Sequence, residues 1–221
     1  MFKKFLFLVC LFISCDLFAV EDCSEFKFNP DININNIDND NVIIEKSEEN
    51  LVGKLGYVKS NITYNVKYIV IPISVKDGFC FSLRSVDVDI KFPEFDIVID
   101  KRLKEDTCAY NIVLQHEKDH IQQDKDVIYS NLENIKKSVL NAAESIKPVF
   151  VENGEETEKN KIKIYEQLTN HKDVVDIISK IKQELRQENE KIDLRGDSFK
   201  IWQCEDFYKE MKDYYDKISI D

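Results

Sequence analysis

The hydrophobic pattern of this chain changes its period once, at about Asp100. Over residues 62–100, apolar side chains recur at every second position, which is typical of strands with one buried face. Beyond Asp100 they recur every three or four residues, which is the spacing of an amphipathic helix. The sequence therefore predicts an α+β fold in which an N-terminal sheet comes first and helices follow and pack against it.

The alternating region predicts an antiparallel sheet of three or more strands. Its clearest alternation covers residues 86–92, and a shorter one covers residues 95–100 after Pro93, a residue that cannot donate a hydrogen bond within a sheet. Residues 20–60 are rich in Asn, Asp and Glu, and we expect them to form an irregular N-terminal segment. Residues 61–221 are expected to form a single domain, because the sheet and the first helix each have one apolar face that the other can cover.

Three helices are expected in the second half of the chain. The first covers about residues 106–147 and ends before Pro148, which cannot continue a helix. The second covers about residues 155–193 and ends before Gly196, and the third covers about residues 198–217. The predicted architecture is thus a sheet followed by one motif-bearing helix and two further long helices.

The first 19 residues have the features of an export signal. Lys3 and Lys4 supply a positive start, and the apolar run after them is too short to span a bilayer as a stable helix. A second interpretation is a lipoprotein leader that ends before Cys15, whose lipid chains would anchor the protein to a membrane. Both interpretations predict an exported protein, in the bacterial periplasm or outside the cell.

Four cysteines follow this leader, and an even number in an oxidising compartment suggests two disulfides. Four cysteines allow three pairings. We favour Cys80–Cys108 together with Cys23–Cys204, since the second bond would tie the two ends of the chain together. Free buried thiols are the alternative.

The formal net charge of the chain is −11. No basic stripe balances this charge, which argues against a nucleic-acid partner. No apolar run after the leader is long enough to cross a membrane as a helix.

The first predicted helix contains an HExxH motif, His116-Glu117-Lys118-Asp119-His120. Residues four apart lie on one face of a helix, so the two imidazoles can bind one zinc ion. Glu117 then lies beside the metal, where it can act as the general base that takes a proton from a metal-bound water. A catalytic zinc site needs three protein ligands, so a third ligand must come from elsewhere in the chain.

Two residues on the apolar stripe of the second predicted helix are candidates for this third ligand. We favour Glu188, with His171 as the alternative. They are 17 positions apart, or about 25 Å along a helix, so at most one of them can reach the metal. Glu184, Glu190 and Asp193 remain open.

The motif residues resemble those of the zincin metallopeptidases, in which the HExxH helix lies under a sheet whose edge strand holds extended substrate. The resemblance implies a zincin-like domain, and in the branch with a glutamate ligand the third ligand comes from a later helix. The chain is also similar to uncharacterised secreted bacterial proteins with a cysteine before the HExxH helix and a late cysteine, here Cys108 and Cys204. It departs from proteolytic zincins at Lys118-Asp119, where those enzymes usually have uncharged residues.

The function that we expect is an exported zinc-dependent hydrolase, a peptidase or amidase, that acts on a peptide or protein substrate. The alternative is a non-catalytic envelope or secreted interaction protein with a degenerate or structural metal site. Its acidic, lysine-rich helices would then form the binding surface. A coincidental motif in a helical scaffold protein is the third interpretation.

Overall fold

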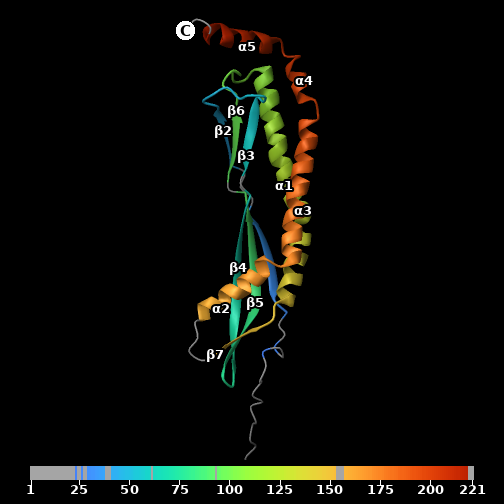
Figure 1. Ribbon diagram of the computed structural model, residues 1–221. Helices are drawn as coiled ribbons and strands as arrows, with labels where there is room; N and C mark the ends of the chain where they lie inside the picture. Colours follow the sequence, from blue (N-terminus) through green and yellow to red (C-terminus); the bar gives the residue numbers. More distant parts are fainter. Residues whose placement is uncertain are drawn as a thin grey trace, which may run out of the picture.

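The computed structural model of the protein describes residues 23, 26, 29–37, 41–60, 62–92, 94–152 and 157–218. The export signal expected at residues 1–19 and the lipidation expected at Cys15 lie outside the described residues. The fold is α+β, as predicted, and elongated. Two sheets follow one another along the molecule, and long helices lie beside both of them (Figure 1).

The two sheets are mixed rather than purely antiparallel. One has the order β1-β5-β4, with β7 also paired to β5, and the other has the order β2-β6-β3. The β1–β5 and β2–β6 pairs are parallel, whereas β4–β5, β5–β7 and β3–β6 are antiparallel. The strands are β1 (Asp31–Ile37), β2 (Val42–Lys46), β3 (Gly56–Ser60), β4 (Thr63–Val75), β5 (Gly78–Lys91), β6 (Phe95–Ile99) and β7 (Val149–Glu152).

The first three strands lie in the segment that was expected to be irregular. Its polar residues serve as cross-strand partners: Asn33 Nδ2 donates to Asp87 Oδ1 at 2.8 Å, and Asn35 Nδ2 donates to Asp89 Oδ1 at 2.9 Å. Such pairs stabilise a sheet without an apolar alternation. The prediction of an irregular segment was therefore wrong. The predicted sheet of three or more strands is present, but it is mixed rather than purely antiparallel.

The HExxH helix is α1 (Cys108–Ser145), within two residues of its predicted bounds. The second predicted helix is two helices, α2 (Thr157–Thr169) and α3 (Lys172–Asp193). The break falls at His171, whose side chain accepts a hydrogen bond from the Asp173 N–H and so caps α3. The third predicted helix is likewise divided, into α4 (Asp197–Ile201) and α5 (Glu205–Ile218).

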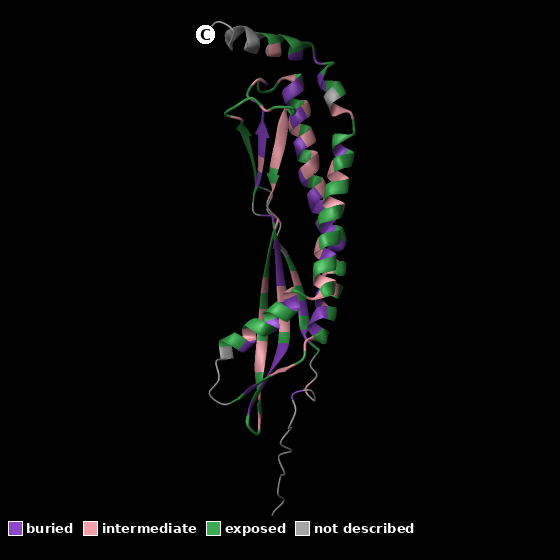
Figure 2. Cartoon of the chain, viewed as in Figure 1, coloured by how far each residue is buried: buried purple, intermediate pink, exposed green. Residues whose placement is uncertain are grey.

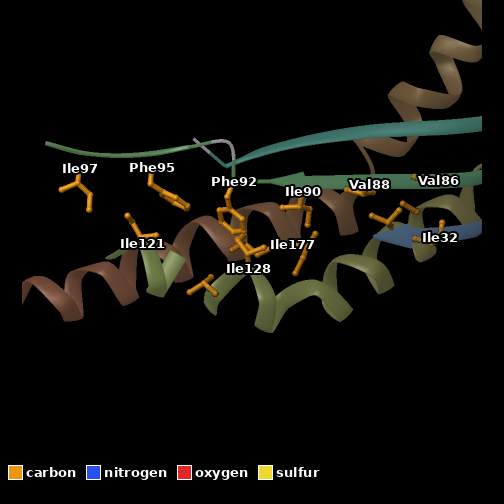
Figure 3. Packing of buried hydrophobic residues seen from close by; sticks show 14 of the residues in the cluster. Ile32, Val86, Val88, Ile90, Phe92, Phe95, Ile97, Ile121, Ile128 and Ile177 are labelled. Atoms are coloured by element: carbon orange, nitrogen blue, oxygen red, sulfur yellow. The ribbon is translucent and has the colours of Figure 1, made fainter. Parts of the chain in front are cut away.

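One hydrophobic core runs along α1 and joins the two sheets. The buried side chains of β5 and β6 face α1, and the Phe92 and Phe95 rings stack with centroids 5.8 Å apart where the chain passes from one sheet to the other (Figure 3). Buried residues therefore follow the inner sides of α1, β5 and β6, while exposed residues dominate the outer side of α3 (Figure 2). The motif helix thus packs against both sheets.

The disulfides are Cys23–Cys80 and Cys108–Cys204, so the favoured pairing was wrong. Cys80 lies near the start of β5, and Lys91 at its end is about 36 Å away at about 3.3 Å per residue. The chain continues through β6 before it reaches Cys108, and a disulfide requires Cα atoms within about 7 Å. The two disulfides are consistent with an oxidising, exported environment. None of the helices among the described residues has the length and hydropathy that a membrane span requires.

Candidate metal centre

Both motif histidines project from the same face of α1. Their rings meet edge to face with centroids 4.8 Å apart, and the Nε2 atoms of His116 and His120 are separated by 3.1 Å. Both side chains are largely buried, with relative exposures of 19% and 15%. The i, i+4 spacing thus brings two nitrogen donors together, as predicted.

The end of α3 brings a third donor to the same point. Asp193 Oδ1 is 3.3 Å from His116 Nε2 and 3.1 Å from His120 Nε2. A tetrahedral ion with bonds of about 2.0–2.1 Å has its ligand atoms about 3.3 Å apart, so this triangle matches one face of such a site. His116, His120 and Asp193 could therefore hold a metal ion. The Asp193 side chain is 62% exposed, so the outer side of the triangle is open to solvent.

The hydrogen bonds around the triangle determine which imidazole nitrogens carry protons. Asn189 Nδ2 donates to Asp124 Oδ1 at 2.9 Å, so Asn189 Oδ1 is the atom that faces His120 Nδ1 at 2.8 Å and accepts its proton. On His116, Nδ1 lies 3.1 Å from Asp197 Oδ2, which can only accept while the carboxylate is ionised. Both Nδ1 atoms therefore act as donors.

It follows that each neutral ring presents an unprotonated Nε2 to the triangle. Two nitrogen lone pairs and a carboxylate oxygen then meet at 3.1–3.3 Å. Three lone-pair-bearing atoms in contact repel one another unless a cation lies between them. A proton can bridge two of these three atoms, whereas a metal ion can bind all three.

Other polar groups hold these outer partners in place. Ser60 Oγ on β3 donates to Asp124 Oδ2 at 3.2 Å, which completes a chain from β3 through α1 and α3 to His120. Lys200 Nζ donates to Asp197 Oδ1 at 2.6 Å. The hydrogen bond from Lys200, together with that from His116, lowers the pKa of Asp197, so this carboxylate stays ionised beside the imidazole.

Glu117 points toward β3, where its Oε1 approaches Gly56, and is only 5% exposed. Burial raises the pKa of Glu117, and the negative charge of Asp193 adds to this effect, while the neighbouring His116, His120 and Lys54 oppose it. The Lys54 ammonium lies 4.1 Å from the centroid of the Tyr57 ring. A buried carboxyl with a raised pKa next to a metal-binding group is typical of a general base.

The triangle and Glu117 line one cleft with a volume of about 1130 Å³. One wall is the segment of residues 50–58, which includes the start of β3. An apolar wall is formed by Ile112, Ile201, Trp202, Phe207 and Met211. The cleft therefore combines the polar metal-binding triangle and Glu117 with a β-strand and an apolar wall.

The third ligand favoured from the sequence does not join the triangle. Glu188 Oε1 accepts a hydrogen bond from Lys191 Nζ at 2.5 Å, and His171 caps the far end of α3. Asp193, which the sequence left open, takes this place. It follows Asn189 by four residues, the spacing of the two histidines, so both reach α1 from one face of α3.

Sequence reasoning did not identify Asp124, Asn189, Asp197 or Ser60. Asp124 carries the one usable signal, because it continues the four-residue spacing of His116 and His120 along α1. Comparison of the chain with models of protein families, with curated proteins and with solved structures finds no match.

Proposed function

We propose that the protein is an exported zinc-dependent hydrolase, a peptidase or amidase. The observation that carries this proposal is the triangle of His116, His120 and Asp193, which brings two imidazole nitrogens and a carboxylate oxygen together in a cleft that also contains a buried glutamate. Two imidazoles and a carboxylate suit zinc, and three protein ligands leave a position for water.

Zinc bound there would polarise a substrate carbonyl and lower the pKa of its bound water. Glu117 would accept the proton of this water and deliver it to the leaving amine. Asn189 and Asp197 would keep the two imidazoles in the tautomer that binds metal through Nε2.

An unpaired edge of β3 supports a peptide substrate. The N–H of Asp100 donates to the carbonyl of Leu55 at 2.8 Å, which identifies this pair as hydrogen-bonded in the antiparallel β3–β6 ladder. Bonded positions alternate along such a strand, so residues 57 and 59 also bond to β6. The N–H and C=O groups of the other residues point to the opposite edge of β3; these residues are Gly56, Val58 and Ser60. Among the described residues, no strand pairs with this edge.

This edge runs alongside the motif face of α1. Gly56 lies against Glu117, and Ser60 bonds to Asp124 two turns further along the same helix. An extended peptide could add to β3 as a further strand and would then pass the metal centre. The apolar wall around Trp202 and Phe207 would receive a large apolar side chain of that peptide.

The test compares zinc-loaded wild type with Glu117→Gln on a randomised library of quenched fluorescent peptides. We expect cleavage by the wild type and a loss of about 100-fold or more in the variant, because a general base contributes about 10²–10⁴-fold. Equal zinc content in both proteins is the control. Equal cleavage, or none by either protein, would contradict a hydrolase of this kind.

The alternative is a non-catalytic envelope or secreted protein in which the metal is a structural clip. One observation favours it: the donors join α1 to α3, and Arg195 Nη1 donates to Asp119 Oδ2 at 3.0 Å beside them. Structural zinc sites are closed, so a fourth protein ligand in the zinc-bound protein, with a chelator-sensitive Tm and no hydrolysis, would support the clip.

The proposed location is the bacterial periplasm or the exterior of the cell, with or without a lipid anchor at Cys15. The two disulfides support an oxidising compartment. Mass spectrometry of the mature protein decides between the two forms. A chain that begins at Cys15 with an added diacylglycerol would establish the anchor, and an unmodified chain that begins near residue 20 would establish the soluble form.

A further inference from the structure

The backbone conformation at Gly56 does not require a glycine. The two described glycines with positive φ are Gly53 and Gly196, so Gly56 has a conformation that other residues adopt freely. Glycine is also disfavoured in a strand, because it has no side chain to pack and loses more entropy than other residues. A glycine in such a position often marks a place where another group comes very close.

Two side chains of α1, Val113 and Glu117, come close to Gly56. A Cβ atom added to Gly56 would lie 2.9 Å from Glu117 Oε1 and 3.3 Å from Glu117 Cγ. It would also lie 2.6 Å from Val113 Cγ1, one turn earlier on α1. Real Cβ atoms essentially never come within 3.0 Å of another heavy atom, so a side chain at residue 56 would force Val113 and the Glu117 carboxylate to shift.

The same residue lies on the unpaired edge of β3. Leu55 bonds to Asp100 on β6, so the N–H and C=O of the next residue point to the other edge. Gly56 is therefore the first outward-facing residue of the strand and the one in contact with the carboxylate. It brings an edge that can bind a peptide backbone against the group that can take a proton.

We propose that Gly56 is a positioning residue for the general base: its missing side chain lets strand β3 lie against Glu117 and fixes where the carboxylate stands relative to the metal and to a β3-bound peptide. This inference rests on the proposed hydrolase function. The three atoms nearest to a Cβ at residue 56 belong to Val113 and Glu117, and none belongs to the metal-binding triangle, so a larger residue would displace the carboxylate before it disturbed the triangle.

The first test is Gly56→Ala, assayed with the single library peptide that the zinc-loaded wild type cleaves fastest. The methyl group would push the Glu117 carboxylate by about 0.5 Å or more, and a misplacement of about 1 Å can cost about 100-fold in rate. We expect kcat to fall by about tenfold or more, KM to change less than kcat, and the zinc content to stay at the wild-type level.

A second pair of variants separates the position of the base from stability. Val113→Ala removes the other atom that the new methyl group would meet, so Gly56→Ala/Val113→Ala retains only the conflict with Glu117. The relevant comparison is this double variant against Val113→Ala alone. Gly78→Ala, whose new Cβ would meet the Val151 carbonyl in the other sheet, controls for a crowded strand alanine far from the metal.

The proposal is upheld if two results hold. The double variant has a kcat about tenfold or more below that of Val113→Ala, and Gly78→Ala, assayed at a temperature below its own Tm, has the wild-type kcat. It is overturned if the double variant and Val113→Ala turn over the peptide equally, or if their zinc contents differ. Failure of the hydrolase proposal has a separate signature, since wild type and Glu117→Gln would then cleave the peptide at the same rate.

Discussion

Asn189→Ala tests the arrangement of partners that surrounds the metal centre. Asn189 Oδ1 accepts the Nδ1 proton of His120 at 2.8 Å, and its Nδ2 is held by Asp124 at 2.9 Å. Truncation removes the acceptor that fixes the tautomer and the ring orientation of His120, but it leaves all three metal donors in place. Loss of such a partner typically weakens metal binding by about 10–100-fold, or about 1.4–2.7 kcal/mol.

The assay is a competition for zinc between the protein and a fluorescent chelator near neutral pH. Glu188→Gln is the matched control, because Glu188 neighbours Asn189 on α3 but pairs with Lys191 outside the triangle. We expect a weaker Kd for Asn189→Ala and a wild-type Kd for Glu188→Gln. A wild-type Kd for Asn189→Ala would refute the role of the hydrogen-bond chain, and zinc loss in Glu188→Gln would return the third-ligand role to that glutamate.

Two further predictions concern stability. Asp100 is fully buried. Burial alone would raise the pKa of its carboxyl group, but hydrogen bonds from Arg102 and from the Leu51 N–H lower this pKa. Because the folded pKa is depressed, this stabilisation is present above the unfolded pKa of about 3.9 and is lost as the pH falls through the folded value. Urea unfolding should therefore show Asp100→Asn less stable than wild type by about 3 kcal/mol at neutral pH, with the difference shrinking below about pH 4; a pH-independent difference would contradict this. Cys108→Ser/Cys204→Ser opens a loop with a sequence separation of 96 residues and should cost about 4–5 kcal/mol in the same assay under oxidising conditions, whereas an unchanged midpoint would show that the bond contributes nothing.

The helical half of the fold could largely be predicted from local sequence patterns. The 3.6-residue period and Pro148 predict α1 to within two residues at each end. The breaks at His171 and Cys204 were missed, since apolar residues recur on both sides of each break. A capping hydrogen bond lies at the first break and a disulfide-bonded cysteine at the second, and neither is visible in hydrophobic periodicity.

Long-range pairings could not be predicted from the same patterns. The parallel β1–β5 and β2–β6 pairs join segments that lie far apart in sequence, and β1 uses Asn33 and Asn35 as partners of aspartates rather than an apolar alternation. The disulfide pairing depends on how β5 and α1 lie along the long axis of the molecule. That arrangement is a property of the assembled fold, so the cysteine positions alone left three pairings open.

The candidate metal centre likewise has a part that the sequence predicts and a part that depends on long-range packing. His116, Glu117 and His120 are fixed by spacing within one helix, which the sequence displays directly. Asp193 is one of several carboxylates near the end of α3, and only the packing of α3 against α1 distinguishes it from Glu188 and Glu190. The apolar stripe of α3 favoured Glu188, whereas the carboxylate that lies beside the two imidazoles belongs to an exposed residue at the end of the helix.

The most direct test of the central claim is the zinc content of the exported mature protein, measured by elemental mass spectrometry beside His116→Ala/His120→Ala and Asp193→Ala. The account predicts about one zinc per chain in the wild type, none in the double histidine variant and a marked loss in Asp193→Ala. A wild type that binds no metal after refolding with zinc, or an Asp193→Ala variant that retains zinc as tightly as the wild type, would contradict it.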